Sequence, residues 1–406
     1  MRHFFHLIAV SVSLLIMSLP AVAGSRPAID VVIAMDVSGS MSGLIDSAKQ
    51  RLWDVVNTFS RAHPQPELRV AIVSFGAPNY GINSGYVRID QPLATDLDSV
   101  NETLFAFTTN GSDEYVARAI ATSINQLDWS QSPNAMRVIF VAGNESAEQD
   151  PAFALEDVLA RAVDMGIIVN AIYCGSENGS IAASWRQLAL QTQGTFAAID
   201  QSANVVAQIE TPVDAQLAEL SKELNKTYIP YGEIGQAGKE RQVKQDDIAR
   251  EMSLGALASR TITKASALYK SVQWDLVDAF EQGQPLSEIA PEMLPEPMQN
   301  MPLDEIEQLV EAQSQRRDEL KKEIAELDAK RRNYVEEYRS TNGAAGLGAA
   351  LSDALTAQAE DGRLRFKSQV ARGACTASRA YQPCIFAQVR LRPPFIAANN
   401  GFRKPS

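Results

Sequence analysis

Six short apolar runs follow one another between residues 28 and 200, and amphipathic segments lie between most of them. The runs are rich in Val and Ile, which is typical of strands buried on both faces of a sheet. The expected strands are AIDVVIAMD, ELRVAIVSF, GYVRIDQ, AMRVIFVAG, GIIVNAIYC and GTFAAID. The third run alternates apolar and polar residues and follows closely on the second, so we expect it to be an antiparallel edge strand.

Helical patterns, with apolar positions three and four residues apart, separate most of these strands. They are expected at residues 44–61, 114–127, 152–165 and 182–192. Short strands that alternate with helices indicate βαβ units. The sequence therefore predicts an α/β domain over residues 28–212, built on a doubly wound, mostly parallel six-stranded sheet.

The strand signals stop after the sixth run, and a helical region is expected over residues 213–340. It starts with an amphipathic helix at 214–228, continues with a helical pattern at 239–280, and then passes through a Pro-rich loop. Residues 303–339 follow a heptad pattern with three polar interruptions, which predicts a coiled-coil-like helix about 54 Å long. A heptad does not identify its partner, so packing on the chain's own helices and homodimerisation both remain open.

The N-terminal segment 1–23 has the features of a cleaved secretory signal peptide. Arg2 precedes an apolar run at 7–19, and the small residues Ala21 and Ala23 frame a cleavage site after Ala23. The apolar run is shorter than the roughly 20 residues that a membrane-spanning helix needs, and an uncleaved anchor is the alternative. We therefore expect a periplasmic or secreted protein.

Export would place the three cysteines in an oxidising compartment. Cys375 and Cys384 lie close enough in the sequence to close a small disulfide loop. Cys174 ends an apolar strand pattern, so we expect a buried free thiol there, with an intermolecular bridge as the alternative.

The chain is acidic, with a formal net charge of -12, which argues against nucleic-acid binding. Residues 341–406 read as a Gly-rich hinge and a basic C-terminal segment. Within it, residues 362–406 hold nine Lys or Arg and no Asp or Glu. Such a segment suits an anionic cell-envelope polymer or an acidic partner, and it equally suits neutralisation of the chain's own acidic surface.

Candidate chemistry lies where the first strand ends, in the sequence DVSGS. Asp36, Ser38 and Ser40 alternate along the chain, so their side chains can point to one side as the loop leaves the strand. One carboxylate and two hydroxyls are hard oxygen ligands that suit Mg²⁺ or Mn²⁺. Ligands bind at the carboxyl ends of strands in open α/β sheets. Helix capping by the same residues is the alternative interpretation.

Around this motif, residues 28–212 resemble the von Willebrand factor type A (VWA) family, whose metal-ion-dependent adhesion site (MIDAS) uses the same Asp-x-Ser-x-Ser sequence. The stretches LFAFTTNGSDEYVARAI, VIFVAGNESAEQDP and LNKTYIPYG resemble a bacterial exported subset of that family. The resemblance implies a Rossmann-like doubly wound sheet. It also implies a metal-bridged contact with a protein partner.

The same resemblance implies two further metal ligands. The first is a hydroxyl from the loop before the mid-domain helix, where Ser112 is the expected residue and Thr109 and Asp113 are alternatives. The second is an Asp after the fourth strand, a position at which this chain offers Asn144, with Glu145 beside it. An amide brings no charge, so the substitution weakens the electrostatic hold on a divalent cation.

These features predict an exported, metal-dependent protein-binding or adhesion module, in which an acidic residue of the partner takes an open coordination position of the cation. The alternative is a metal-free structural scaffold of the cell envelope with a degenerate site. We do not expect an enzyme, because two of the three histidines lie in the signal peptide. The sequence also contains neither a nucleophile elbow nor a phosphate-binding loop.

Overall fold

A computed structural model describes most of the chain between residues 26 and 342. The described residues are 26–42, 45, 46, 49, 53, 58–111, 113–199, 209–342, 358, 365 and 366. The chain divides into two units, Met1–Lys367 and Ser368–Ser406, and all described residues belong to the first. Within the described ranges, no helix has the length and apolar character that a membrane span requires. The expected disulfide between Cys375 and Cys384 and the basic C-terminal segment lie outside these ranges.

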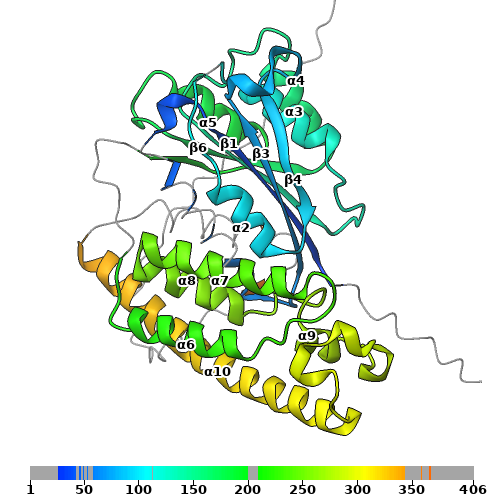
Figure 1. Ribbon diagram of the computed structural model, residues 1–406. Helices are drawn as coiled ribbons and strands as arrows, with labels where there is room; N and C mark the ends of the chain where they lie inside the picture. Colours follow the sequence, from blue (N-terminus) through cyan, green and yellow to red (C-terminus); the bar gives the residue numbers. More distant parts are fainter. Residues whose placement is uncertain are drawn as a thin grey trace, which may run out of the picture. The chain divides into compact units, whose positions relative to one another are not determined.

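A six-stranded sheet organises the N-terminal part of the molecule, with strand order β4-β3-β1-β5-β6-β7 (Figure 1). The strands are β1 Ala28–Asp36, β3 Glu67–Phe75, β4 Val87–Ala94, β5 Met136–Gly143, β6 Ile167–Tyr173 and β7 Phe196–Ala198. Every pairing is parallel except that of β3 with the edge strand β4. The predicted fold class, a mostly parallel doubly wound sheet with an antiparallel edge strand, is confirmed. The strand order reverses about β1, which places the end of β1 at the switch point.

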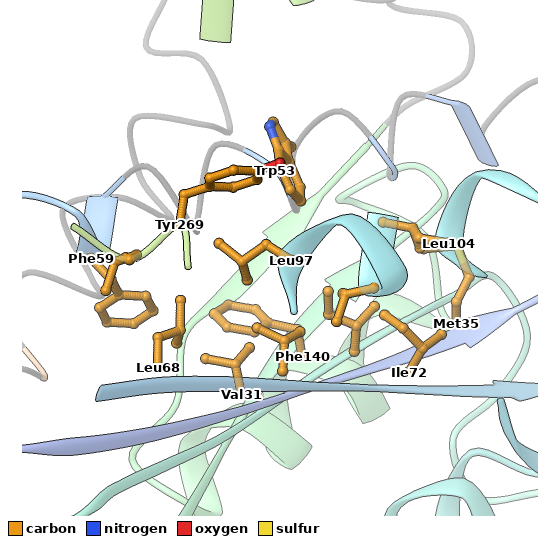
Figure 2. Packing of buried hydrophobic residues seen from close by; sticks show 14 of the residues in the cluster. Val31, Met35, Trp53, Phe59, Leu68, Ile72, Leu97, Leu104, Phe140 and Tyr269 are labelled. Carbon is orange, nitrogen blue, oxygen red and sulfur yellow. The ribbon is translucent and has the colours of Figure 1, made fainter. Parts of the chain in front are cut away.

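Helices cover both faces of this sheet because alternate residues of the central strands point to opposite sides. On one face Val31, Met35 and Phe140 pack against Leu97 and Leu104, as Figure 2 shows. On the other face the second hydrophobic core joins the sheet to three further helices. Within the described ranges, these helices are α2 Leu97–Phe105, α3 Val116–Gln126, α4 Leu155–Asp164 and α5 Ala182–Gln191.

The region after the sheet is helical, as predicted, but it is divided more finely than the sequence pattern indicated. It contains α6 Asp214–Lys226, α7 Gly235–Met252, α8 Leu254–Ala265, α9 Leu276–Glu281 and α10 Leu303–Asn342. The continuous pattern expected at 239–280 is three helices. One break falls at Ser253, whose backbone is extended and whose side chain accepts a hydrogen bond from the Ala256 amide, as an N-cap does.

The long helix α10 buries its heptad seam against its own chain. Ile306, Val310, Leu320, Ile324 and Leu327 are buried, and α10 packs on α6, α8 and α9. Since the seam is occupied within the chain, intramolecular packing is the arrangement found, and homodimerisation through it is not shown. Toward the C-terminal end of the helix the seam reaches the surface.

Arg317, a polar residue in the heptad seam, fixes the register of α10 against the helices it packs on. The Arg317 side chain is fully buried, and its Nη1 lies 2.7 Å from Asp275 Oδ2 and 2.6 Å from Asp278 Oδ1. Its Nη2 donates to the Thr227 carbonyl at 2.7 Å, and its guanidinium stacks on Tyr228. A buried charge needs such complete pairing, so a shift of α10 would leave these carboxylates unpaired.

A second buried ion cluster joins the helical region to the sheet domain through α2. Arg260 of α8 lies 2.9 Å from Asp98 of α2 and 2.6 Å from Asp246 of α7. Asp246 also pairs with Lys264 at 2.5 Å. Burial alone raises the pKa of Asp246, but the charges of Lys264 and Arg260 outweigh burial and hold that pKa below its usual value. The cluster therefore stabilises the contact between the helical region and the sheet domain.

Candidate metal centre

The Asp36 carboxyl group lies at the carboxyl end of β1, fully buried between the ends of β3 and β5. Glycines on both neighbours make room for it. A Cβ atom at Gly76 would lie 2.9 Å from Asp36 Oδ1, and one at Gly143 would lie 3.3 Å from Asp36 Oδ2. Gly76 has φ +86°, a left-handed conformation that glycine adopts at little cost. These two glycines line the space that the Asp36 carboxyl group fills, which we call the chamber.

The serines that follow Asp36 turn toward the same place. The Ser38 amide donates to Asp36 Oδ1 at 2.8 Å, and the Ser38 and Ser40 hydroxyls lie 2.8 Å apart. The Ser40 hydroxyl donates to Asn144 Oδ1 at 3.1 Å. Ser38 makes no side-chain capping bond to the short 3₁₀ turn Gly39–Met41, so capping of this turn does not account for the position of its hydroxyl. Four of the five predicted ligands are therefore brought together.

The fifth predicted ligand, Ser112, lies outside the described residues. Of its alternatives, Thr109 is half-buried and Asp113 is exposed. From the same loop the structure instead brings the buried side chain of Glu114 to the site. A Cβ atom at Gly76 would lie 3.1 Å from Glu114 Cγ and 3.3 Å from Ser38 Cβ.

Sequence reasoning missed Glu114 for two reasons. The helix was expected to begin at this residue, whereas α3 begins at Val116 and Glu114 is still in the loop. The resemblance also implies a hydroxyl ligand from this loop, so Ser112 was expected there, with Thr109 and Asp113 as the alternatives. The available signal was an acid just before an apolar helix, in a loop already expected to reach the site.

Both carboxyl groups are held in an environment that opposes their charge. Burial, followed by the charge of Glu114, raises the pKa of Asp36 to about 7, against the lowering effect of its hydrogen bonds. Burial and the charges of Glu145 and Asp113 raise the pKa of Glu114, while hydrogen bonds from Ser38 and Ser40 lower it. A positive charge between the two would reverse this penalty.

Two buried oxygen atoms at the site lack a hydrogen-bond partner among the described residues. They are Asp36 Oδ2 and Glu114 Oε2. Buried polar atoms without partners cost free energy, so their occurrence in one chamber requires an explanation. Two carboxylates, two hydroxyls and an amide oxygen are the hard donors that Mg²⁺ and Mn²⁺ take. The residues present therefore fit a divalent cation.

The described residues contain no cluster of three or more His, Cys, Asp or Glu side chains that could hold a metal. The candidate site does not contradict this, because only two of its donors are carboxylates and the others are neutral. A soft thiolate ligand is also absent from the site. Cys174 is a buried free thiol, as predicted, and burial raises its pKa to about 12.

The loops that carry the site are tied to rigid elements. The Trp185 indole, fully buried on α5, donates to the Glu145 carbonyl at 2.8 Å. The Asn110 amide donates to the Val37 carbonyl at 2.8 Å, which joins the loop before α3 to the end of β1. Gln149 donates to the Glu114 carbonyl at 2.9 Å. These bonds fix the relative positions of the three loops before any ligand binds.

Comparison with known proteins agrees with the fold. The family model of the von Willebrand factor type A domain matches residues 30–212. This part of the chain is therefore a VWA domain, a class of domain that commonly mediates protein interaction and often does so through a metal ion. A search of curated proteins finds no match to the chain.

Similar solved structures are distant. A von Willebrand factor type A protein from Catenulispora acidiphila is 17% identical with a TM-score of 0.34, and the match covers 44% of this chain and 40% of that one. Proximal thread matrix protein 1 from the mussel byssus, with a zinc-occupied MIDAS motif, is 12% identical with a TM-score of 0.36, over 44% and 43%. The SpRpn10 VWA domain is 13% identical with a TM-score of 0.34, over 45% and 95%. The chain thus spans about two fifths of the length of the first two, and the site is argued from its own geometry.

Proposed function

We propose that this protein is an exported protein-binding module whose VWA domain binds a divalent cation, Mg²⁺ or Mn²⁺, at the end of β1. The observation that carries the proposal is the chamber in which Asp36 and Glu114 each bury an unpartnered carboxylate oxygen. Hydroxyl donors from Ser38 and Ser40 meet there. Asn144 accepts from Ser40 and so orients that hydroxyl.

The residues of the site have two kinds of role in this proposal. Asp36 and Glu114 supply negative charge, and Ser38 and Ser40 supply neutral lone pairs. When bound, the cation supplies a coordination position that a carboxylate of the partner fills. Two site carboxylates already balance the charge of a divalent cation, so short-range coordination, more than net charge, holds the partner's acid.

Calorimetric titration of the full chain with MgCl₂ and MnCl₂ tests the proposal. The native chain should bind one cation per molecule, and Asp36→Ala should abolish binding while the far-ultraviolet circular dichroism stays unchanged. Asp318→Ala is the matched control, because that carboxylate is exposed on α10. Equal affinity of the Asp36 variant and the native chain would refute the proposal.

A metal-free structural role is the second candidate. It is favoured by the bond between Ser40 and Asn144, which satisfies two polar groups of the site without a cation. The same titration separates the candidates, since a scaffold shows no heat of binding with either metal. Export is tested separately, by the mass of the mature N-terminus, which should correspond to cleavage after Ala23.

A further inference from the structure

The loops around the candidate metal centre have a one-sided charge. They leave the carboxyl ends of β1, β3, β5 and β6 or precede α3, and they comprise residues 37–42, 76–86, 107–115, 144–154 and 174–181. These five sequences contain six Asp or Glu residues and no Lys, Arg or His. Asp36, the last residue of β1, adds a seventh carboxyl group to the same edge. We call this edge the acidic face.

Among the described residues, the basic side chains that contact the acidic face from neighbouring elements have acidic partners of their own. The pairs are Arg118 with Asp150, Arg186 with Glu177, Arg88 with Asp90, and Lys49 with Asp46. The remaining carboxyl groups of the face make no ion pair with the described residues. They are Asp36, Asp113, Glu114, Glu145 and Glu148. Even a divalent cation balances fewer than half of these five charges.

Aromatic rings lie beside these carboxylates. Tyr115 follows Glu114 directly, and its ring centroid lies 6.0 Å from that of Tyr86. The Arg118 guanidinium lies over the rings of Tyr115 and Phe153, at 5.1 and 5.0 Å from their centroids. Phe153 is 38% exposed, so part of it remains open to a partner. Rings next to uncompensated acids favour cationic side chains through cation–π contacts.

We propose that the partner of this face is a basic polypeptide segment in which a single carboxylate, the one that reaches the metal, is flanked by Lys or Arg. This proposal rests on the proposed function and adds the chemistry around the coordinating acid. An acidic partner surface would meet Asp113, Glu145 and Glu148 at close range and be repelled. Basic flanks turn the same charges into attraction, and nucleic acids and other polyanions are excluded at this face.

Three capped, fluorescent seven-residue peptides test the proposal by anisotropy with the full chain and MgCl₂ or MnCl₂. One has a central Glu flanked by four Lys, the second a central Glu flanked by four Ser, and the third a central Gln flanked by four Lys, with Gly at the remaining positions. At low ionic strength the first should bind about tenfold more tightly than the second. The difference should shrink as salt is raised toward 1 M, where screening acts over roughly 3 Å.

A charge reversal on the protein tests whether the preference for the Lys-flanked peptide arises at the acidic face. Glu148→Lys, at an exposed position of the acidic face, should lower the preference for the Lys-flanked Glu peptide several-fold. Glu292→Lys, at an exposed position of the helical region, is the control and should leave the preference unchanged.

The outcomes separate the two proposals. Equal binding of the Lys-flanked and Ser-flanked Glu peptides, or no binding by any peptide with metal present, overturns the basic-partner inference. If the Glu and Gln peptides with Lys flanks bind equally and EDTA changes neither, the charge preference stands and the metal-bridged function fails.

Discussion

The Ser40 hydroxyl donates a hydrogen bond of 3.1 Å to Asn144 Oδ1, between loops that lie 104 residues apart in the sequence. The two residues meet because β1 and β5 are parallel neighbours, with Met35 opposite Ala142 near their carboxyl ends. Parallel register therefore converts two distant loop positions into one site. The VWA resemblance implies an Asp where this chain has Asn144, so the bond lies at a position where an uncharged amide stands in place of that acid.

Restoring that charge should strengthen metal binding. We expect Asn144→Asp to raise the affinity for Mg²⁺ about tenfold, because ligand charge count tunes the affinity of such sites. Asn144→Leu should lower it, since the Ser40 hydroxyl then loses its acceptor. Calorimetric titration measures both. An unchanged affinity in Asn144→Asp would mean that this residue does not face the cation.

Metal binding should depend on pH, because protons compete for Asp36. Its pKa in the metal-free protein is about 7, so below that value the cation must displace a proton. The logarithm of the affinity should rise by about one unit per pH unit from pH 5 to 7 and level off above. Titrations in buffers of different ionisation enthalpy should detect the released proton. A flat profile would contradict this role for Asp36.

The metal-free protein should become less stable as pH rises, whereas its affinity for the cation increases. The folded pKa of Asp36 is raised from 3.8 to about 7, so its contribution is complete below pH 4 and is lost as pH rises through 7. The loss is on the order of 1.4 kcal/mol per pH unit within that window. The Asn side chain of Asp36→Asn cannot ionise, so the urea-unfolding free energy of this variant should not show this decline with pH. Saturating Mg²⁺ should restore the unfolding free energy of the native chain at pH 7.

The space around Asp36 can be tested through two glycines with similar positive φ angles. Gly76 and Gly81 have φ of +86° and +81°, but only Gly76 has neighbours within 4 Å of an added Cβ atom. Gly81→Ala should cost about 1 kcal/mol of backbone strain, and Gly76→Ala should cost about 2 kcal/mol or more. Gly76→Ala should also weaken metal binding, because its methyl group would displace the Asp36 carboxylate. Equal effects in unfolding and titration would argue against a tight chamber.

The contribution of the buried Arg317 guanidinium to stability can be measured against that of its exposed neighbour on α10, Arg316. Arg317→Ala should lower the free energy of unfolding by about 3–5 kcal/mol, because Asp275 and Asp278 remain buried without a cation. Arg316→Ala should change it by less than about 0.5 kcal/mol, because Arg316 pairs with Glu319 in solvent. Urea unfolding followed by circular dichroism compares the two. Similar values would mean that the seam does not depend on Arg317.

The sheet was predictable from the sequence because its strands are buried on both faces. β1 Ala28–Asp36 and β3 Glu67–Phe75 have the bounds that their apolar runs indicate. The helix α2 was missed, since Leu97–Phe105 is short and several of its residues are polar. Its start depends on the Asp96 side chain, which accepts from two amides of the first turn, and on docking of the helical region.

The site was predictable only as far as local spacing reaches. Asp36, Ser38 and Ser40 are close in sequence, so their convergence follows from one strand and one turn. Glu114 comes from another loop and lies beside Gly76, so its place at the site depends on a contact between segments that are distant in the sequence. The partner of the heptad seam was undetermined for the same reason, because α6, α8 and α9 are separate from α10 in the sequence.

Anomalous diffraction from crystals of the full chain grown with MnCl₂ tests the central claim most directly. The account predicts an anomalous peak at the carboxyl end of β1, with Asp36, Ser38 and Ser40 around it and Glu114 beside it. An anomalous map with no peak between these side chains, from crystals in which the chain is otherwise ordered, would contradict it.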